Sequence, residues 1–115
     1  MSIKIERIGS LMEKEISMIL QRKAKDEILK EVSISFVEVT NDLSFAKVYF
    51  TCYNKDKKDQ ILKSLENAKG YIRTELASRI DVRHVPELRF IFDESIEYGM
   101  KIEKKIQEIH EKENK

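Results

Sequence analysis

Residues 61–93 constrain the fold of this chain more than any other stretch. As far as Ile80 the apolar residues recur three or four positions apart, the spacing that stacks side chains along one face of a helix. Gly70 interrupts the helical pattern, and Pro86 ends whatever follows it. From 88 to 93 large apolar residues recur at alternate positions, as in a strand. The segment therefore predicts a helix, a break, a second helix, a turn and a strand.

An amphipathic helix is predicted before this segment. Apolar residues between Ile5 and Leu20 form a single stripe, with charged residues on the other faces. Gly9 lies inside the stripe and costs roughly 1 kcal/mol relative to alanine. We expect this helix to pack on a sheet.

Two strands are predicted between the helices, over 32–39 and 45–53, where apolar residues alternate with polar ones. Asp42 lies in the turn between them and can accept hydrogen bonds from nearby backbone amides. The alternation shifts between Phe36 and Val37, which indicates either a bulge or a strand covered on both faces at that end. The two strands should form a hairpin.

Helix starts are indicated at two further positions. Asp56 is an N-cap candidate for the helix that begins near Lys57, and Ser95 for a last helix that extends to about Ile109. The resulting order, α-β-β-α-kink-α-β-α, predicts a two-layer α+β domain with helices on one face of a three-stranded sheet. We expect one domain over residues 1–110 and a frayed, charged tail over 111–115.

The overall charge does not by itself indicate a nucleic-acid partner. The 115 residues include 22 cations and 21 acidic residues, so any attraction to phosphate must come from how the charges are arranged. The single cysteine, Cys52, fits a reducing compartment, and no apolar run is long enough to cross a bilayer. We expect a cytoplasmic protein with no membrane partner.

Enzymatic and metal-binding motifs are missing from the sequence. His84 and His110 stand far apart, and Cys52 lies on the apolar face of a predicted strand. Asp93 and Glu94 are adjacent, so in a strand they would point to opposite faces and would not share a cation. We predict a non-enzyme without cofactor or metal.

Two motifs carry a family resemblance that covers nearly the whole chain. The runs NAKGYIRTEL and VRHVPELRFIFDESIEYG, with VSISFVEVTNDLSFAKVYF before them, resemble the bacterial ribosome-binding factor A family. This resemblance implies a KH-like fold of type II. It also implies a factor that associates with free immature 30S ribosomal subunits, binds 16S rRNA, assists late 30S maturation and 5′-end processing, and is important in cold adaptation.

The resemblance places a kink at Ala68, Lys69 and Gly70, where RNA-binding KH domains carry a GxxG loop that this chain lacks. Gly70 either ends a helix without binding anything or lets RNA approach the backbone, with the next helix directing its N-terminal amides at a phosphate. The RNA-binding candidates lie at or after this kink, in the second half of the chain: Lys69, Gly70, Arg73, Arg79, Arg83 and Arg89.

Each of these candidates also has a purely structural interpretation. The cations could be solvated surface residues, and Arg73 or Arg79 could pair with Glu66 or Glu75. Tyr49 and Tyr53 could stack RNA bases on an open sheet or could be half-buried strand residues. Phe90 and Phe92 are predicted to belong to the core.

Two other functions fit the same sequence. The chain could be a protein-interaction module that recruits an assembly GTPase or a ribosomal protein, which its near-zero net charge favours. It could also be a generic KH-type RNA binder, which the missing second glycine disfavours. In each case we expect a monomer.

Overall fold

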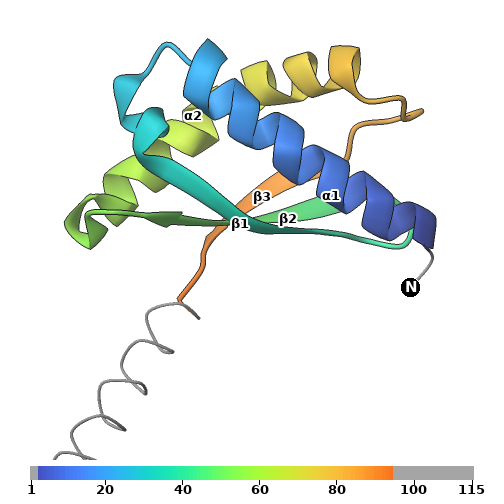
Figure 1. Cartoon of the computed structure of the whole chain (residues 1–115), viewed down its shortest axis with the longest axis horizontal. Helices are drawn as coiled ribbons and strands as arrows, with labels where there is room; N and C mark the ends of the chain where they lie inside the picture. Colours follow the sequence, from blue (N-terminus) through green and yellow to red (C-terminus); the bar gives the residue numbers. More distant parts are fainter. Residues whose placement is uncertain (1–2, 95–115) are drawn as a thin grey trace, which may run out of the picture.

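The computed structural model describes residues 3–94. Two long helices, α1 (Ile3–Met18) and α2 (Lys58–Arg79), lie on the same side of a sheet formed by β1 (Val32–Val39), β2 (Phe45–Cys52) and β3 (Glu87–Phe92) (Figure 1). Three short helical segments connect them: η1 (Ile19–Lys23), η2 (Glu27–Glu31) and η3 (Lys55–Lys57). The predicted two-layer α+β fold is confirmed.

The sheet has the order β1-β2-β3. β1 pairs with β2 in the antiparallel direction, as predicted for a hairpin, and β3 returns parallel to β2 after α2. Ala46, Val48 and Phe50 of the central strand are fully buried under the helices. The core therefore lies between the helical layer and one face of the sheet.

The irregularity predicted in β1 is a bulge. The register passes from Ile34 opposite Phe50 to Phe36 opposite Tyr49, so Ser35 has no partner in the ladder. The hydroxyl of Ser35 donates to Asp93 Oδ2 at 2.8 Å and lies 3.2 Å from the Tyr49 carbonyl oxygen. The bulge at Ser35 therefore lies just before the shift predicted between Phe36 and Val37. Its hydroxyl links β1 to Asp93, the residue that follows β3.

α1 packs closely on β1 through Gly9. This glycine is buried, and a Cβ atom placed on it would lie 2.9 Å from the backbone oxygen of Val37. Met12 and Ile16 continue the contact with no exposed surface. Gly9 therefore permits a close approach between helix and strand that no larger residue would allow without movement.

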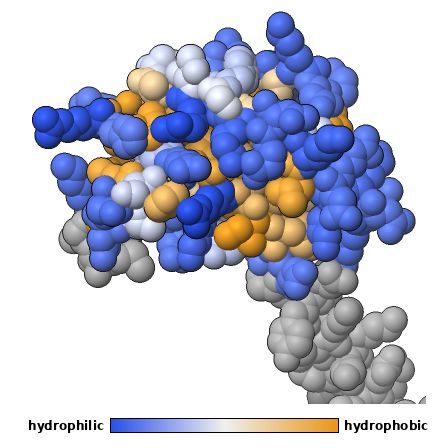
Figure 2. Space-filling view, turned by 180° about the vertical axis from the view of Figure 1, so that it is seen from behind, coloured by the Kyte–Doolittle hydropathy of each residue, from blue (hydrophilic) through white to orange (hydrophobic). Residues whose placement is uncertain are grey.

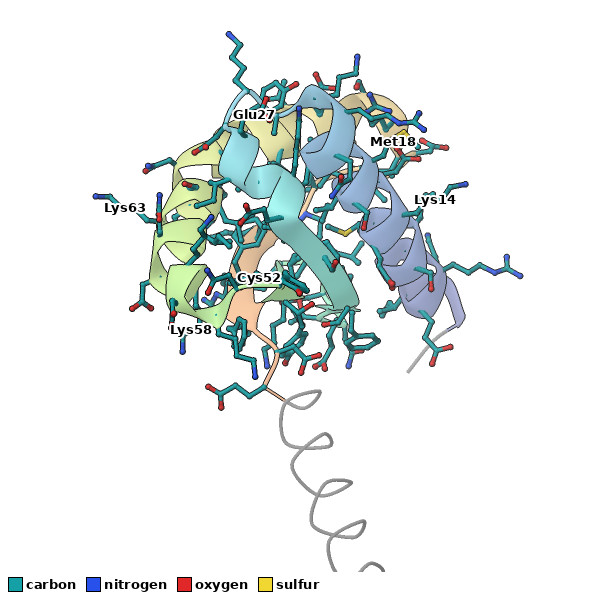
Figure 3. The ribbon with its side chains drawn as sticks, turned by 60° about the vertical axis from the view of Figure 1, so that its left-hand side comes forward. Lys14, Met18, Glu27, Cys52, Lys58 and Lys63 are labelled. Carbon is teal, nitrogen blue, oxygen red and sulfur yellow. The ribbon has the colours of Figure 1, made fainter. Side chains whose placement is uncertain are left out.

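The predicted break in the second helix is wrong. α2 is helical from Lys58 to Arg79 and includes Gly70, which is exposed and has nothing within 4 Å of where a Cβ would be. The ribbon of α2 nevertheless changes direction along its length in Figures 1 and 3. The hydroxyl of Thr74 donates to the Gly70 carbonyl at 3.0 Å, a bond that often bends a helix.

The helix is continuous because its apolar positions continue on both sides of Gly70. Ile61, Leu65, Ile72 and Leu76 are all fully buried. Their burial outweighs the roughly 1 kcal/mol that glycine costs inside a helix. The assignment of the bend to Ala68, Lys69 and Gly70 stays a prediction.

The cap predicted at Asp56 is also wrong. Asn54 accepts a hydrogen bond from the Asp56 amide at 3.0 Å and caps η3, which leads directly into α2. The predicted last helix with its cap at Ser95, and the tail over 111–115, lie outside the described residues.

Candidate nucleic-acid interface

Arg73 is held inside the fold. Its Nη2 donates to the carbonyl oxygen of Val85 at 2.8 Å, and its Nε is buried without a hydrogen-bond partner among the described residues. Val85 itself is buried in the connection between α2 and β3. The guanidinium therefore fastens this connection to α2.

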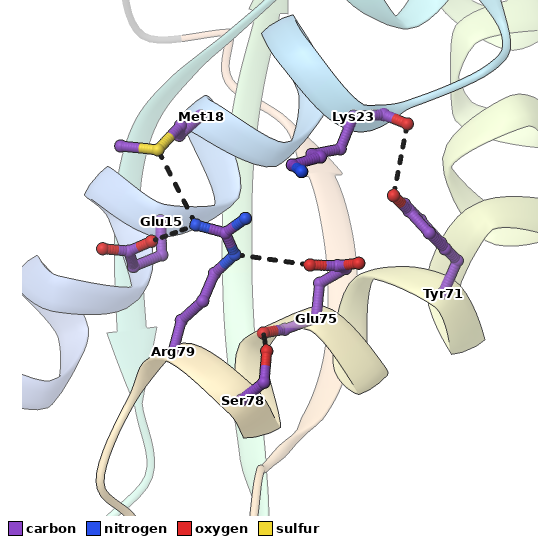
Figure 4. A network of polar contacts seen from close by, with 7 residues as sticks. All are labelled: Glu15, Met18, Lys23, Tyr71, Glu75, Ser78 and Arg79. Atoms are coloured by element: carbon purple, nitrogen blue, oxygen red, sulfur yellow. Dashed lines mark hydrogen bonds and ion pairs between the residues drawn. The ribbon is translucent and has the colours of Figure 1, made fainter.

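Arg79 joins the two long helices (Figure 4). Its Nε lies 3.4 Å from Glu75 of the same helix, and its Nη1 lies 3.5 Å from Glu15 of α1. Nη1 also lies 3.8 Å from the Met18 sulfur. Of the pairings considered as alternatives to RNA contact, that of Arg79 with Glu75 is present, and most of this guanidinium is turned toward protein.

Lys69 and Gly70 lie at the middle of α2. Lys69 forms an ion pair with Glu66 at 2.6 Å, and its side chain is only 25% exposed. Its ammonium also lies 6.0 Å from the centre of the ring of Phe90, a residue of β3. Gly70 is open to solvent.

Arg83 and Arg89 are the exposed cations among the six candidates. Arg83 lies in the connection after α2, next to His84, which is exposed there. The guanidinium carbon of Arg89 lies 4.0 Å from the centre of the Phe45 ring, on the sheet face away from the helices. The six predicted residues therefore do not form one surface.

The sheet face away from the helices carries exposed rings. Phe36 is 51% exposed and its ring centre lies 6.1 Å from that of Tyr49. Lys47 is paired in register with Arg89, so two cations stand side by side next to these aromatic residues. Tyr53 is fully exposed beyond the end of β2, and Phe90 is buried as predicted.

A second group of cations was not selected from the sequence. The exposed side chains of this group form no ion pair with the described residues: Arg22, Lys23, Lys25 and Lys63. Three of them follow one another closely in the run RKAK at the end of η1, which is the signal that could have identified them. Lys63 points outward from α2 (Figure 3).

Two surface hollows differ in their charge. One, of about 290 Å³, lies between α1 and β1 and is lined by Glu6, Glu13 and Glu38. The other, of about 320 Å³, lies between α2 and the loop after η1 and is lined by Lys25, Asp26, Asn67 and Tyr71 among others.

Apolar surface is also exposed between hydrophilic side chains on the rear of the molecule (Figure 2).

Among residues 3–94, two titratable groups have a shifted pKa. The backbone amide of Ser44, and then the hydroxyls of Ser44 and Thr40, hold the pKa of Asp42 below its ordinary value. Burial, followed by the negative charge of Glu31, raises the pKa of the Cys52 thiol. Asp42 therefore accepts backbone hydrogen bonds in the hairpin turn, as predicted.

The described part of the chain holds no group of His, Cys, Asp or Glu residues suited to a metal ion. None of its helices is long and apolar enough to cross a membrane.

Comparison with known proteins identifies the family. The model of the family described as Ribosome-binding factor A matches residues 4–106. Ribosome-binding factor A of Staphylococcus carnosus is 50% identical over 96% of this chain and 96% of its own length. The protein of that name from Francisella philomiragia is 40% identical over 97% of this chain and 78% of its own length.

The chain belongs to the ribosome-binding factor A family.

Solved members of the ribosome-binding factor A family share the fold. The crystal structure from Thermus thermophilus has a TM-score of 0.71 over 76% of this chain and 93% of its own, at 20% identity. A homology model of the Thermus thermophilus factor, fitted into a cryo-EM map of a 30S complex, has a TM-score of 0.63 over 75% of this chain and 91% of its own, at 21% identity. The family model and the relatives confirm the resemblance inferred from the runs NAKGYIRTEL and VRHVPELRFIFDESIEYG, and the solved structures show the shared fold.

Proposed function

We propose that this member of the ribosome-binding factor A family associates with free immature 30S subunits through 16S rRNA. We further propose that it assists late 30S maturation and 5′-end processing of the rRNA in the cytoplasm, with greatest importance in the cold. The observation that carries the proposal is the family match over residues 4–106. The fitted 30S complex of the Thermus thermophilus factor supports the choice of subunit.

The proposed mechanism is non-catalytic. Cationic side chains hold rRNA backbone in one arrangement and so shift the population of a conformation that the RNA already samples. Such binding depends on phosphate charge and weakens steeply as salt rises.

The six predicted RNA-binding residues take different roles in this proposal. Arg83 and Arg89 are exposed and contact RNA directly. Arg73 and Arg79 are engaged by Val85, Glu75 and Glu15, so they hold the scaffold that presents the surface. Lys69 and Gly70 mark the middle of α2, where RNA passes close to the helix.

Charge reversal tests the RNA contacts. Arg83→Glu with Arg89→Glu should leave the circular dichroism spectrum unchanged, because both side chains are exposed. Co-sedimentation of this double variant with free 30S subunits should fall by about tenfold at moderate salt. The matched control is Arg7→Glu with Lys14→Glu on the exposed surface of α1, which should bind as the original chain does. If both double variants co-sediment equally well, Arg83 and Arg89 do not contact the RNA.

A protein partner is the second candidate function, and the hollow between α1 and β1 favours it. Glu6, Glu13 and Glu38 give that hollow a negative rim that suits a basic protein segment, such as one from an assembly GTPase or a ribosomal protein. Ribonuclease treatment of the complex separates the two functions. Release by ribonuclease supports rRNA docking, whereas retention supports a protein contact.

A further inference from the structure

The hollow beside the middle of α2 has two different walls. One wall is the loop over residues 24–26 together with Leu29 of η2. The other is the α2 surface that presents Ser64, Asn67 and Tyr71, with Ala68 between them. It has a volume of about 320 Å³ and does not include any of the six cationic and glycine positions predicted for RNA.

The Tyr71 side chain fixes the distance between these walls. Its hydroxyl donates to the carbonyl oxygen of Lys23 at 3.2 Å, which joins α2 to the end of η1 (Figure 4). Tyr71 as a whole remains 41% exposed, so its hydroxyl is anchored while part of its surface is available for contact. A tyrosine held in this way offers a rigid surface at low entropic cost.

Unused hydrogen-bonding groups lie next to this ring. The Asn67 amide and the Ser64 hydroxyl line the hollow and form no side-chain hydrogen bond with the described residues. An asparagine amide offers donors and an acceptor in one plane, which matches the edge of a nucleobase. Ala24, Ala68 and Leu29 supply apolar surface that suits the face of a ring.

Two of the nearby acidic residues are paired with cations, whereas Asp26, which lines the hollow, accepts only a backbone amide and keeps its negative charge. Asp26 accepts from the Ile28 amide at 3.2 Å, Glu27 pairs with Lys30 at 3.1 Å, and Glu66 pairs with Lys69 at 2.6 Å. Lys25 also lines the hollow, and it belongs to a group of exposed cations on η1, the loop after it and α2 that have no ion-pair partner in the described structure: Arg22, Lys23, Lys25 and Lys63. These four cations outnumber the one unpaired carboxylate among the described residues that line the hollow, Asp26, so the net unpaired charge is positive and suits a chain of phosphates.

We propose that this hollow accepts one unstacked nucleobase of single-stranded RNA. The base lies against Tyr71 and the apolar wall, and Asn67 and Ser64 bond its edge. Lys25 and Lys63 hold the phosphates on either side. This inference rests on the proposed rRNA-binding function and assigns to it a site for an unpaired nucleotide.

A protein segment fits this hollow less well. The walls belong to α2 and to a loop with a short helix, so no strand edge is available to pair with a peptide backbone. The free cations would also repel a basic segment, which instead matches the acidic hollow between α1 and β1.

Binding of a short oligonucleotide to the full chain tests the site. The probe is a fluorescent single-stranded RNA of about six nucleotides, compared with an oligomer of equal charge whose central nucleotides are abasic. The intact oligomer should bind at least about fivefold more tightly, because only the intact oligomer has a base that can stack on the Tyr71 ring. Equal affinity for both oligomers would show that charge alone holds the RNA, and would overturn the proposal.

A matched pair of substitutions tests whether the base binds in this hollow. Asn67→Leu removes an amide that lines the hollow. Gln60→Leu removes an amide from another exposed position of α2, outside the hollow. Asn67→Leu should reduce affinity for the intact oligomer by about fivefold and leave affinity for the abasic oligomer unchanged. Gln60→Leu should change neither, and equal effects of the two substitutions would refute the assignment to this hollow.

Co-sedimentation with 30S subunits separates this inference from the proposed function. If the unsubstituted chain co-sediments but does not distinguish the two oligomers, the base site is wrong and the function is retained. If the unsubstituted chain fails to co-sediment, the proposed function is wrong, whatever the oligomers show.

Discussion

The two described glycines lie in the two long helices, and their surroundings are opposite. Gly9 is buried in α1, and a Cβ there would lie 2.9 Å from the Val37 backbone oxygen. Gly70 is exposed in α2, and a Cβ there would have nothing within 4 Å. Glycine lowers helix stability to the same extent at both positions by intrinsic propensity. Only at Gly9 does the packing require a residue without a side chain.

This difference distinguishes the ways in which the helices are attached. At Gly9 the backbone of α1 lies so close to the backbone of β1 that no side chain fits between them. A larger residue at this position would therefore force the helix to move. α2 is attached through side chains such as Leu65 and Ile72, and through polar contacts from Arg73 and Tyr71. Its outer surface is therefore free to carry binding residues without altering the core.

The largest expected effect is that of Gly9→Val. The added carbons would overlap backbone, which moves less easily than a side chain, so α1 must shift from β1. We expect the free energy of unfolding to fall by about 2–3 kcal/mol. Urea denaturation followed by circular dichroism measures this change. A loss below about 0.5 kcal/mol would show that α1 is not tightly packed.

A smaller loss is expected from Arg73→Leu. The substitution removes the 2.8 Å hydrogen bond to Val85 and leaves a buried carbonyl without this donor. The free energy of unfolding should fall by about 1–2 kcal/mol. Arg83→Leu is the matched control, because Arg83 is exposed, and should change stability by less than about 0.5 kcal/mol. Equal stabilities of the two variants would contradict the structural role of Arg73.

Gly70→Ala should stabilise the protein, in contrast to the two substitutions above. Alanine fits the open space and reduces the entropy of the unfolded chain, so the free energy of unfolding should rise by up to about 1 kcal/mol. The same urea titration measures it, and Gly9→Ala is the natural comparison because it should lose stability. A destabilised Gly70→Ala protein would indicate that the bend of α2 depends on glycine.

The smallest effect concerns the turn of the hairpin on which α1 rests. The Asp42 carboxylate accepts hydrogen bonds from the Ser44 amide at 3.0 Å and from the Thr40 hydroxyl at 2.9 Å, which hold its pKa below its ordinary value. Its contribution is therefore present above the pKa of the unfolded state and is lost as pH falls through the lower pKa of the folded state. Urea midpoints below about pH 4 should fall less in Asp42→Asn than in the original chain. Identical acid profiles would exclude a stabilising charge at this turn.

The sequence predicts the elements of this fold well and the contacts between them poorly. Alternation at Ala46, Val48 and Phe50 is sufficient to identify a strand with one buried face, because the signal is local. The predicted break at Gly70 is wrong because the local preference of glycine against helix is smaller than the stabilisation from burying Leu65 and Ile72 on either side of it. The importance of Gly9 was missed because it depends on the position of Val37 in space.

The candidate site shows the same limit. The pairing of Arg79 with Glu75 is visible in sequence because the residues are four apart, whereas Glu15 is separated from Arg79 by 64 positions. The distribution of Arg83 and Arg89 over different parts of the surface could be known only once β3 was placed beside β2. The hollow at Asn67 depends likewise on the loop after η1, which no local pattern connects to α2.

The parallel pairing of β2 with β3 has a consequence for biosynthesis. Leu88 and Phe90 lie beside Ala46 and Val48 in the ladder, but they are translated only after all of α2. A nascent chain that ends before them exposes part of the central strand and the underside of α2 to water. The core between α2 and the sheet is therefore complete only after β3 has left the ribosome, and we expect nascent chains that end before β3 to be cleaved by protease more readily than the folded chain.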